Sequence, residues 1–213
     1  MKMIFLGPPG AGKGTQAAVI SKACNIPAIS TGDMIRSEIK AETELGKMAD
    51  GYIRRGELVP DDVVIGIVKE RLSKDDCKNG YILDGFPRTI AQAEALIRMN
   101  ISIDFVIDLD VSDDKIAKRM SGRLYCRGCG ATYHRLYNPP QKENICDNCD
   151  TPLSVRDDDR EDVVLGRLKV YHAQTKPLED FYKNLGLLRR VDASKPIEEI
   201  TANILTLIGK TEQ

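Results

Sequence analysis

Short apolar segments alternate along the chain with longer segments whose apolar residues recur at helical spacing. Five apolar runs predict β-strands at 2–6, 28–30, 80–85, 103–109 and 187–191. Periodic segments predict helices at about 13–24, 60–72, 89–99, 112–121 and 197–208. Because apolar strands alternate with helices, we expect an α/β fold with a five-stranded parallel sheet flanked by helices.

Residues 30–59 depart from this alternation, because they are helical in pattern with no strand between the helices. Thr31 is expected to cap the first helix, with Asp33 in its electropositive first turn. We expect the helical stretch to break near Gly46 and to end at Gly56. This segment is therefore predicted to be an insertion into the core.

Residues 122–159 depart from it in another way, since they are rich in Cys, Pro, Asn and Asp and show weak periodicity. They are expected to form a second, small inserted domain. The remaining core would then consist of residues 1–29, 60–121 and 160–213.

The net charge and composition narrow the classes of partner. The 213 residues include 42% hydrophobic and 30% charged residues, with a net charge of −1. The chain therefore lacks the excess of positive charge that would favour a nucleic-acid or anionic-membrane partner. The apolar run at the N-terminus is shorter than a secretory signal requires, and no run approaches the roughly 20 residues of a membrane span. We expect a cytoplasmic protein.

A glycine-rich segment, G-P-P-G-A-G-K-G-T at residues 7–15, lies between the first predicted strand and the first predicted helix. In that position, backbone N–H groups can turn inward around an anion, and the helix dipole adds to the attraction. Lys13 can reach the terminal phosphates of a nucleotide. Gly14 stands where phosphate-binding loops usually carry Ser or Thr, and Thr15 follows it.

This variant loop resembles that of adenylate kinases and related nucleoside-monophosphate kinases. Three further segments are similar to motifs of that family: S-T-G-D-M-I-R at 30–36, D-G-F-P-R-T at 84–89 and R-D-D-D at 156–159. The resemblance extends over essentially the whole chain. It implies a three-layer P-loop kinase fold, an AMP-binding domain at 30–59, a lid at 122–159, and the reaction ATP + AMP = 2 ADP.

The chemistry of that reaction is mostly electrostatic. Two nucleotides bring about six negative charges, and the attacking phosphate oxygen is already largely ionised because its second pKa is about 6. No general base is needed, and neither of the two histidines lies in a recognised catalytic motif. Planar guanidinium groups bind phosphate oxygens with two hydrogen bonds.

The resemblance assigns roles residue by residue. Catalytic roles fall to Lys13, Arg36, Arg88, Arg123, Arg156 and Arg167. The ATP side comprises Gly10, Ala11, Gly12, Lys13, Gly14, Thr15, Arg119, Arg123, Thr132, Tyr133 and Lys195, the last through its carbonyl oxygen. The AMP side comprises Thr31, Arg36, Glu57, Leu58, Val59, Gly85, Phe86, Pro87, Arg88, Gln92, Arg156 and Arg167. Since Arg119 and Arg123 are four residues apart, we expect them on one helical face.

Two metal ions are expected. Mg²⁺ bridges the ATP phosphates in this family and keeps several waters, so Asp84, and after it Asp33, would contact it through water. Two C-x-x-C pairs, formed by Cys126, Cys129, Cys146 and Cys149, are typical of a structural Zn²⁺ site. Disulfide pairing is the alternative, and a reducing compartment disfavours it.

Other functions stay open. Another nucleoside-monophosphate kinase, acting on UMP or CMP, would share most of these motifs, although such relatives usually carry a small apolar residue where Thr31 stands. A zinc-ribbon ATPase that binds nucleic acid would also combine a P-loop with C-x-x-C pairs. A zinc scaffold without enzymatic activity would leave Lys13 and the arginines unexplained. The expected partners are ATP, AMP and ADP, and the family is usually monomeric.

Overall fold

The computed structural model describes residues 1–210. Its centre is a five-stranded sheet in the order β2-β3-β1-β4-β8, in which every neighbouring pair of strands is parallel. The strands are β1 (Lys2–Leu6), β2 (Ala28–Ser30), β3 (Tyr81–Asp84), β4 (Phe105–Asp110) and β8 (Leu188–Asp192). The expected α/β class with five parallel strands is confirmed.

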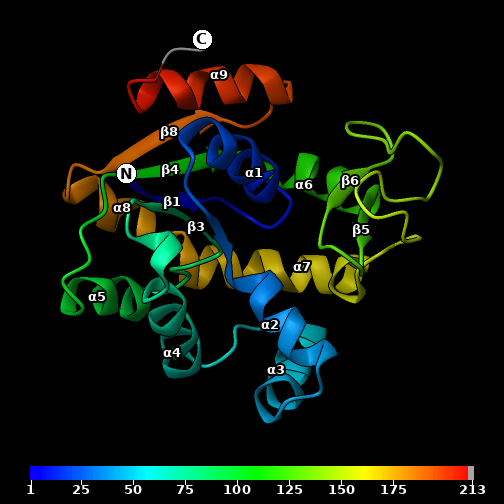
Figure 1. The fold of residues 1–213 in the computed structure, drawn as a ribbon, viewed down its shortest axis with the longest axis horizontal. Helices are drawn as coiled ribbons and strands as arrows, with labels where there is room; N and C mark the ends of the chain where they lie inside the picture. Colours follow the sequence, from blue (N-terminus) through cyan, green and yellow to red (C-terminus); the bar gives the residue numbers. More distant parts are fainter. Residues whose placement is uncertain (211–213) are drawn as a thin grey trace.

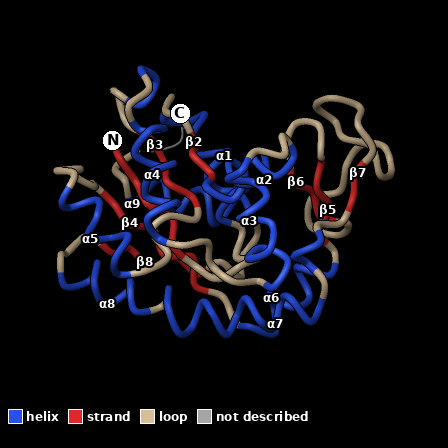
Figure 2. The backbone as a smooth tube through the Cα atoms, turned by 90° about the horizontal axis from the view of Figure 1, so that it is seen from below, coloured by secondary structure: helices blue, strands red, loops and turns tan. Residues whose placement is uncertain are grey.

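Helices cover both faces of this sheet (Figures 1 and 2). Side chains alternate along β1, so that Met3 and Phe5 belong to one hydrophobic core and Ile4 and Leu6 to the other. The first core is completed by α1 (Lys13–Cys24) and α9 (Ile197–Leu207), and the second by α4 (Asp61–Leu72) and α5 (Ile90–Arg98). Within residues 1–210, no helix combines the length and the apolar composition needed to cross a membrane.

The insertion after β2 consists of α2 (Thr31–Lys40) and α3 (Glu44–Arg55), which lie below the sheet in Figure 1. The cap of α2 is Ser30, not Thr31 as expected, because the Ser30 hydroxyl accepts from the Asp33 N–H at 3.2 Å. The break falls at residues 41–43, not near Gly46. Gly46 is buried inside α3, and a Cβ there would collide with the backbone of α2. This glycine therefore marks a close approach of two helices.

The second insertion is a small antiparallel sheet in the order β6-β5-β7, which projects to the right in Figure 1. It follows α6 (Asp113–Ser121) and contains β5 (Arg123–Cys126), β6 (Thr132–His134) and β7 (Leu153–Ser154). A separate small core holds it together, formed by Leu124, Cys126, Tyr133 and Cys146. This small antiparallel sheet with its own core lies within residues 122–159 and is called the lid sheet below.

No element was expected over residues 160–186, and the structure shows a long helical segment there. It begins with α7 (Glu161–Val170), widens into a π-helical turn (Tyr171–Thr175) and continues as α8 (Pro177–Asn184). Its buried residues recur every three or four positions: Val164, Leu168, Tyr171, Thr175, Leu178 and Tyr182. The helical signal was thus present in the sequence. In Figure 2, α7 and α8 run along the lower edge and join the second insertion to the sheet.

Candidate functional site

The glycine-rich loop lies between the end of β1 and the start of α1. Gly10 and Gly12 have φ values of +79° and +97°, which other residues rarely adopt, and Gly12 is the N-cap of α1. No side chain caps this helix, so the first N–H groups of α1 are available to an anion. The Lys13 ammonium donates to the carbonyl oxygens of Gly7 and Pro8, at 2.7 and 2.8 Å. The loop is therefore folded around its own lysine.

Lys13 and Asp84 face one another in a buried setting. Burial lowers the pKa of Lys13 to about 8. The negative charge of Asp84 opposes this shift, and the positive charges of Arg88 and Arg167 add to it. Burial also raises the pKa of Asp84, against the pull of Lys13 and Arg88. Both shifts favour the uncharged form, because removal from water is the largest influence on each group; the neighbouring arginines add to the shift of Lys13 and oppose that of Asp84. A polyphosphate placed here would restore the balance of charge.

Six arginines converge on this region from separate elements: Arg36 of α2, Arg88 after β3, Arg119 of α6, Arg123 of β5, Arg156 after β7 and Arg167 of α7. The expectation that Arg119 and Arg123 share a helical face is wrong, because α6 ends at Ser121. Arg119 donates to the Ala193 carbonyl oxygen at 2.7 Å, whereas Arg123 extends from the lid sheet. Both nevertheless line the same cavity.

Buried carboxylates hold two of these arginines. Asp159, whose side chain is fully buried, accepts from Nε and Nη2 of Arg123 through its two carboxylate oxygens. Arg167 pairs with Asp158 at 2.8 Å and lies 3.3 Å from Asp159. Burial, with neighbouring cations, lowers the pKa of Arg167 to about 10. The run of three acids after Arg156 was the available signal for these counter-ions, but sequence reasoning did not assign them this role.

Two adjoining cavities surround the cluster. The larger, of about 780 Å³, is lined by every residue expected on the ATP side: Gly10, Ala11, Gly12, Lys13, Gly14, Thr15, Arg119, Arg123, Thr132, Tyr133 and Lys195. Asp33, Asp84 and Arg156 also line it. The P-loop, the lid and the start of α9 therefore enclose one space.

The smaller cavity, of about 120 Å³, is lined by most residues expected on the AMP side: Thr31, Arg36, Glu57, Leu58, Val59, Gly85, Pro87, Arg88, Gln92 and Arg167. Phe86 is fully buried in the core beside it, and Arg156 faces the larger cavity instead. Residues that line both cavities are Pro9, Lys13, Gly32, Arg36, Gly85, Arg88 and Arg167. The two spaces thus meet at the cationic cluster.

A hydrogen-bonded network shapes the floor of the smaller cavity. Gln92 donates through Nε2 to Asp61 at 2.7 Å and accepts at Oε1 from the Arg88 N–H at 2.7 Å. The Thr31 hydroxyl donates to the Gly85 carbonyl oxygen at 2.8 Å. Asp61 also accepts from the Thr89 hydroxyl. Sequence reasoning missed Asp61, because its partners lie about thirty residues further along the chain.

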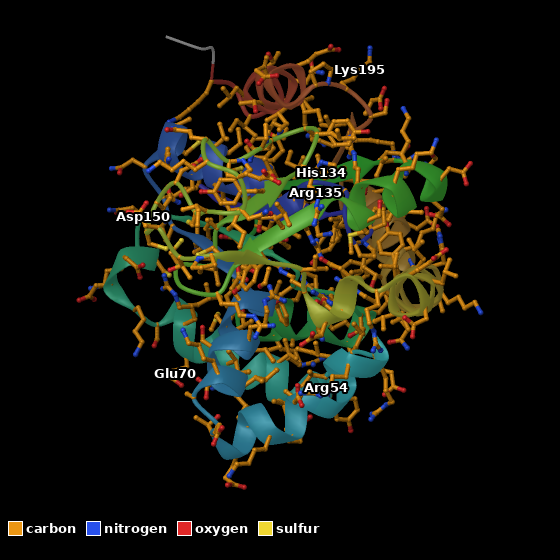
Figure 3. The ribbon with its side chains drawn as sticks, turned by 90° about the vertical axis from the view of Figure 1, so that its right-hand side faces the viewer. Arg54, Glu70, His134, Arg135, Asp150 and Lys195 are labelled. Atoms are coloured by element: carbon orange, nitrogen blue, oxygen red, sulfur yellow. The ribbon has the colours of Figure 1, made fainter. Side chains whose placement is uncertain are left out.

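His134 of the lid was likewise missed, since no spacing pattern distinguishes it. Its Nδ1 accepts from the N–H groups of Leu136 and Tyr137, at 3.0 and 3.2 Å, and the side chain lines the larger cavity. Figure 3 views the molecule from the lid side, with His134 near the centre and Lys195 above it. The Lys195 ammonium pairs with Glu199 at 3.4 Å, so its side chain is already engaged.

The four lid cysteines form one cluster. The Sγ atoms of Cys126, Cys129, Cys146 and Cys149 all lie within 4.8 Å of one another. Cys126 and Cys149 are 3.4 Å apart, and Cys129 and Cys146 are 3.5 Å apart. Zn–S bonds of about 2.3 Å place tetrahedral sulfurs about 3.8 Å apart. The cluster therefore fits a single tetrahedral ion. Two independent disulfides would not require all four sulfurs to lie so close together.

Comparison with known proteins agrees with this geometry. A family model described as adenylate kinase matches residues 5–187. An adenylate kinase of Caldicellulosiruptor bescii is 55% identical over 98% of this chain and 99% of its own. An adenylate kinase of Archaeoglobus fulgidus is 53% identical over 99% of both chains, and one of Bacillus licheniformis is 53% identical over 98% of both. The chain therefore belongs to the adenylate kinase family.

Proposed function

We propose that the larger cavity binds ATP and the smaller one AMP, and that the chain catalyses the adenylate kinase reaction ATP + AMP = 2 ADP. The observation that carries this proposal is the set of four cationic side chains common to both cavities: Lys13, Arg36, Arg88 and Arg167. A phosphoryl group in transfer between two nucleotides must pass the boundary of the two spaces. Positive charge is concentrated at that boundary.

The residues act mainly by position and charge. The P-loop N–H groups and Lys13 hold the ATP phosphates, and Arg36 and Arg88 hold the AMP phosphate. Arg123, Arg156 and Arg167 face the group in transfer, whose charge spreads over its equatorial oxygens in the transition state. In the structure the guanidinium group of Arg123 donates to Asp159, and the guanidinium group of Arg36 donates to Asp33. A phosphate oxygen would replace Asp33 at Arg36 when AMP binds, whereas Arg123 would keep Asp159 at Nε and Nη2 and face the group in transfer with its remaining N–H groups.

The residues around the P-loop also fit Mg²⁺. The Asp84 Oδ2 lies 3.3 Å from the position that a Cβ on Gly14 would take, so its carboxylate faces the loop. Asp33 lines the same cavity. We propose that both hold the ion through its waters. When bound, Mg²⁺ would supply positive charge that neutralises the phosphates.

The two insertions are proposed to act as covers. Residues 30–59 would close over AMP and residues 122–159 over ATP, with 1–29, 60–121 and 160–213 as the core. Closure excludes water, which would otherwise accept the phosphoryl group. Gly122 and residues 157–160 are the proposed hinges, and regular elements end or begin beside both. The expected cytoplasmic location and monomeric state stay predictions.

The lid cysteines are proposed to bind Zn²⁺ in a structural site. Four thiolates fill a tetrahedral ion and leave no position for a reactive water, so the ion would take no part in phosphoryl transfer. Its proposed purpose is to hold together a lid with a very small core.

The identity of the phosphate acceptor gives the direct test of the proposed function. Production of ADP from MgATP should depend on AMP, with kcat/KM for AMP above that for UMP, CMP or GMP in the same coupled assay. A higher value for UMP or CMP would identify another nucleoside-monophosphate kinase. If no ADP forms with AMP and the protein instead binds DNA or RNA with steep salt dependence, the zinc-ribbon ATPase would be favoured.

The affinity for MgATP should fall as the pH rises above about 8. Burial sets the pKa of Lys13 at about 8 in the free protein. Bound phosphates stabilise the ammonium and raise its pKa, so MgATP binds the protonated form more tightly. The Kd should be nearly constant below pH 7.5 and then rise by up to about tenfold per pH unit until the pKa of the complex is reached.

Titration calorimetry between pH 6.5 and 9.5 measures this dependence. Lys13→Arg is the matched control, because its guanidinium stays protonated throughout this range, so the slope should disappear even if the affinity is lower. A wild-type Kd that is flat from pH 7 to 9.5 would contradict the assignment of Lys13 to the ATP phosphates.

A further inference from the structure

Tyr125 lies on the central strand of the lid sheet, opposite Thr132 of β6 and Ser154 of β7. Alternation along β5 buries Leu124 and Cys126 in the lid core, and turns Tyr125 to the face that also carries Arg123. The Tyr125 side chain is half-buried although this face is not part of the lid core. Its packing partners must therefore come from outside that core.

Those partners are two arginines from different parts of the molecule. The Cζ atom of Arg156 lies 4.2 Å from the centroid of the Tyr125 ring, and that of Arg36 lies 5.7 Å from it. Both distances fall within the roughly 6 Å over which an aromatic face attracts a cation. Arg36 belongs to α2, in the insertion at 30–59, whereas Arg156 follows the last lid strand. One ring thus contacts a cation of each insertion.

The two cations repel one another in a setting with little water. Burial lowers the pKa of Arg156 to about 10, and Arg36 and Arg123 contribute to the shift. Asp33 offsets part of the repulsion, since it pairs with Arg36 at 2.6 Å and lies 3.8 Å from Arg156. AMP phosphate binding would draw Arg36 away from Asp33. The Tyr125 ring would then act together with Asp158, whose charge also attracts both guanidinium groups.

A glycine allows Arg36 to take this position. A Cβ on Gly32 would lie 2.9 Å from Arg36 Nη2, so the guanidinium folds over the first turn of α2 where no side chain stands. A second contact joins the same two insertions, because the Lys40 ammonium donates to the Arg127 carbonyl oxygen at 3.2 Å. The lid and α2 therefore touch at two points, between Tyr125 and Arg36 and between Arg127 and Lys40.

We propose that Tyr125 is a positioning residue, whose aromatic face holds Arg36 and Arg156 toward the shared boundary of the two cavities and so couples lid closure to the AMP site. This inference rests on the proposed roles of those two arginines. It has a specific consequence: substitution of a residue in the lid over the ATP side should change KM and kcat/KM for AMP. A Tyr125 that only filled space in the lid would have no such effect.

The experiment compares Tyr125→Leu and Tyr125→Phe with Tyr137→Leu. Tyr137 is a lid tyrosine that lines only the larger cavity, so it is the matched control for the same substitution. Steady-state KM and kcat are measured for AMP at saturating MgATP, and for MgATP at saturating AMP. Metal content and Tm are measured on each variant, so that loss of the lid fold is recognised.

Tyr125→Leu should raise KM for AMP and lower kcat/KM for AMP by about 5- to 30-fold, because two cation–aromatic contacts are lost. Tyr125→Phe keeps the aromatic face and should stay within about twofold of wild type. Tyr137→Leu should alter KM for MgATP and leave KM for AMP unchanged.

An unchanged KM for AMP in a metal-loaded Tyr125→Leu protein would overturn the inference. Equal losses in the Leu and Phe variants would also overturn it, since the hydroxyl and not the ring face would then be responsible. Both results presuppose a wild-type protein that forms ADP from ATP and AMP. Absence of that activity in the wild type would instead remove the proposed function itself.

Discussion

Arg123→Ala is expected to lower kcat by about 10³-fold, the range in which single cationic groups act on phosphoryl transfer. Arg123 projects from β5 into the larger cavity, on the lid side opposite the P-loop. Its fork is oriented in advance by both oxygens of Asp159. A guanidinium held in place before the reaction stabilises developing charge without reorganising at that moment. Single-turnover kinetics with saturating MgATP and AMP would measure the loss.

The same substitution leaves Asp159 with only its 3.3 Å contact to Arg167, which already pairs with Asp158, and a buried carboxylate that loses its main partner destabilises the fold. The double variant Arg123→Ala, Asp159→Asn separates the two effects, because it removes the cation and the buried charge together. Its Tm should recover toward wild type while kcat stays low. Arg123→Lys keeps the charge but loses the fork, so an intermediate kcat is expected. Activity of Arg123→Ala near that of wild type would exclude Arg123 from the catalytic set.

The parts of the molecule that sequence predicted well depend on local patterns. The strands are short apolar runs, the P-loop combines a strand end with glycines and Lys13, and the cysteine cluster follows from two pairs at fixed spacing. Each strand and the P-loop lie within a few consecutive residues, and each cysteine pair within four. These patterns were sufficient for the five-stranded sheet, and the resemblance of several motifs was sufficient for the family.

The parts that sequence missed depend on contacts between distant segments. Helical spacing alone placed Arg119 and Arg123 together, yet α6 ends between them and the chain enters the lid sheet. Gly46 resembled a helix break because the backbone of α2 that packs against it is not visible in a local window. Asp61 and His134 carry no motif, and only the fold brings Asp61 to Gln92 and His134 to the larger cavity. Tertiary packing decided each of these positions.

Removal of the lid metal is expected to lower Tm by about 10 °C, while phosphoryl transfer persists at temperatures below the new transition. The lid core consists of a few side chains, two of which are the proposed metal ligands Cys126 and Cys146. Because such a site does not exist in the unfolded chain, the free energy of metal binding is part of the free energy of folding. A loss of about 3–5 kcal/mol corresponds to this change, at about 2–4 °C per kcal/mol for a chain of this size. Calorimetry with and without a chelator, under reducing conditions and with metal analysis, would measure it.

Two cysteine variants make this test specific. Cys146→Ser removes a buried ligand, so its Tm should resemble that of the metal-free wild type and should not respond to chelator. Cys24 lies outside the cluster, packed against the main core, so Cys24→Ser should keep the full response. If verified metal-free protein melts at the same temperature as the loaded form, the lid must be held by its other contacts. The Tyr133 hydroxyl, which accepts from the Asp147 N–H at 2.9 Å, joins the two halves of the lid without metal. That bond alone is worth about 1 kcal/mol, too little to stabilise the lid, which is why we expect the metal to dominate.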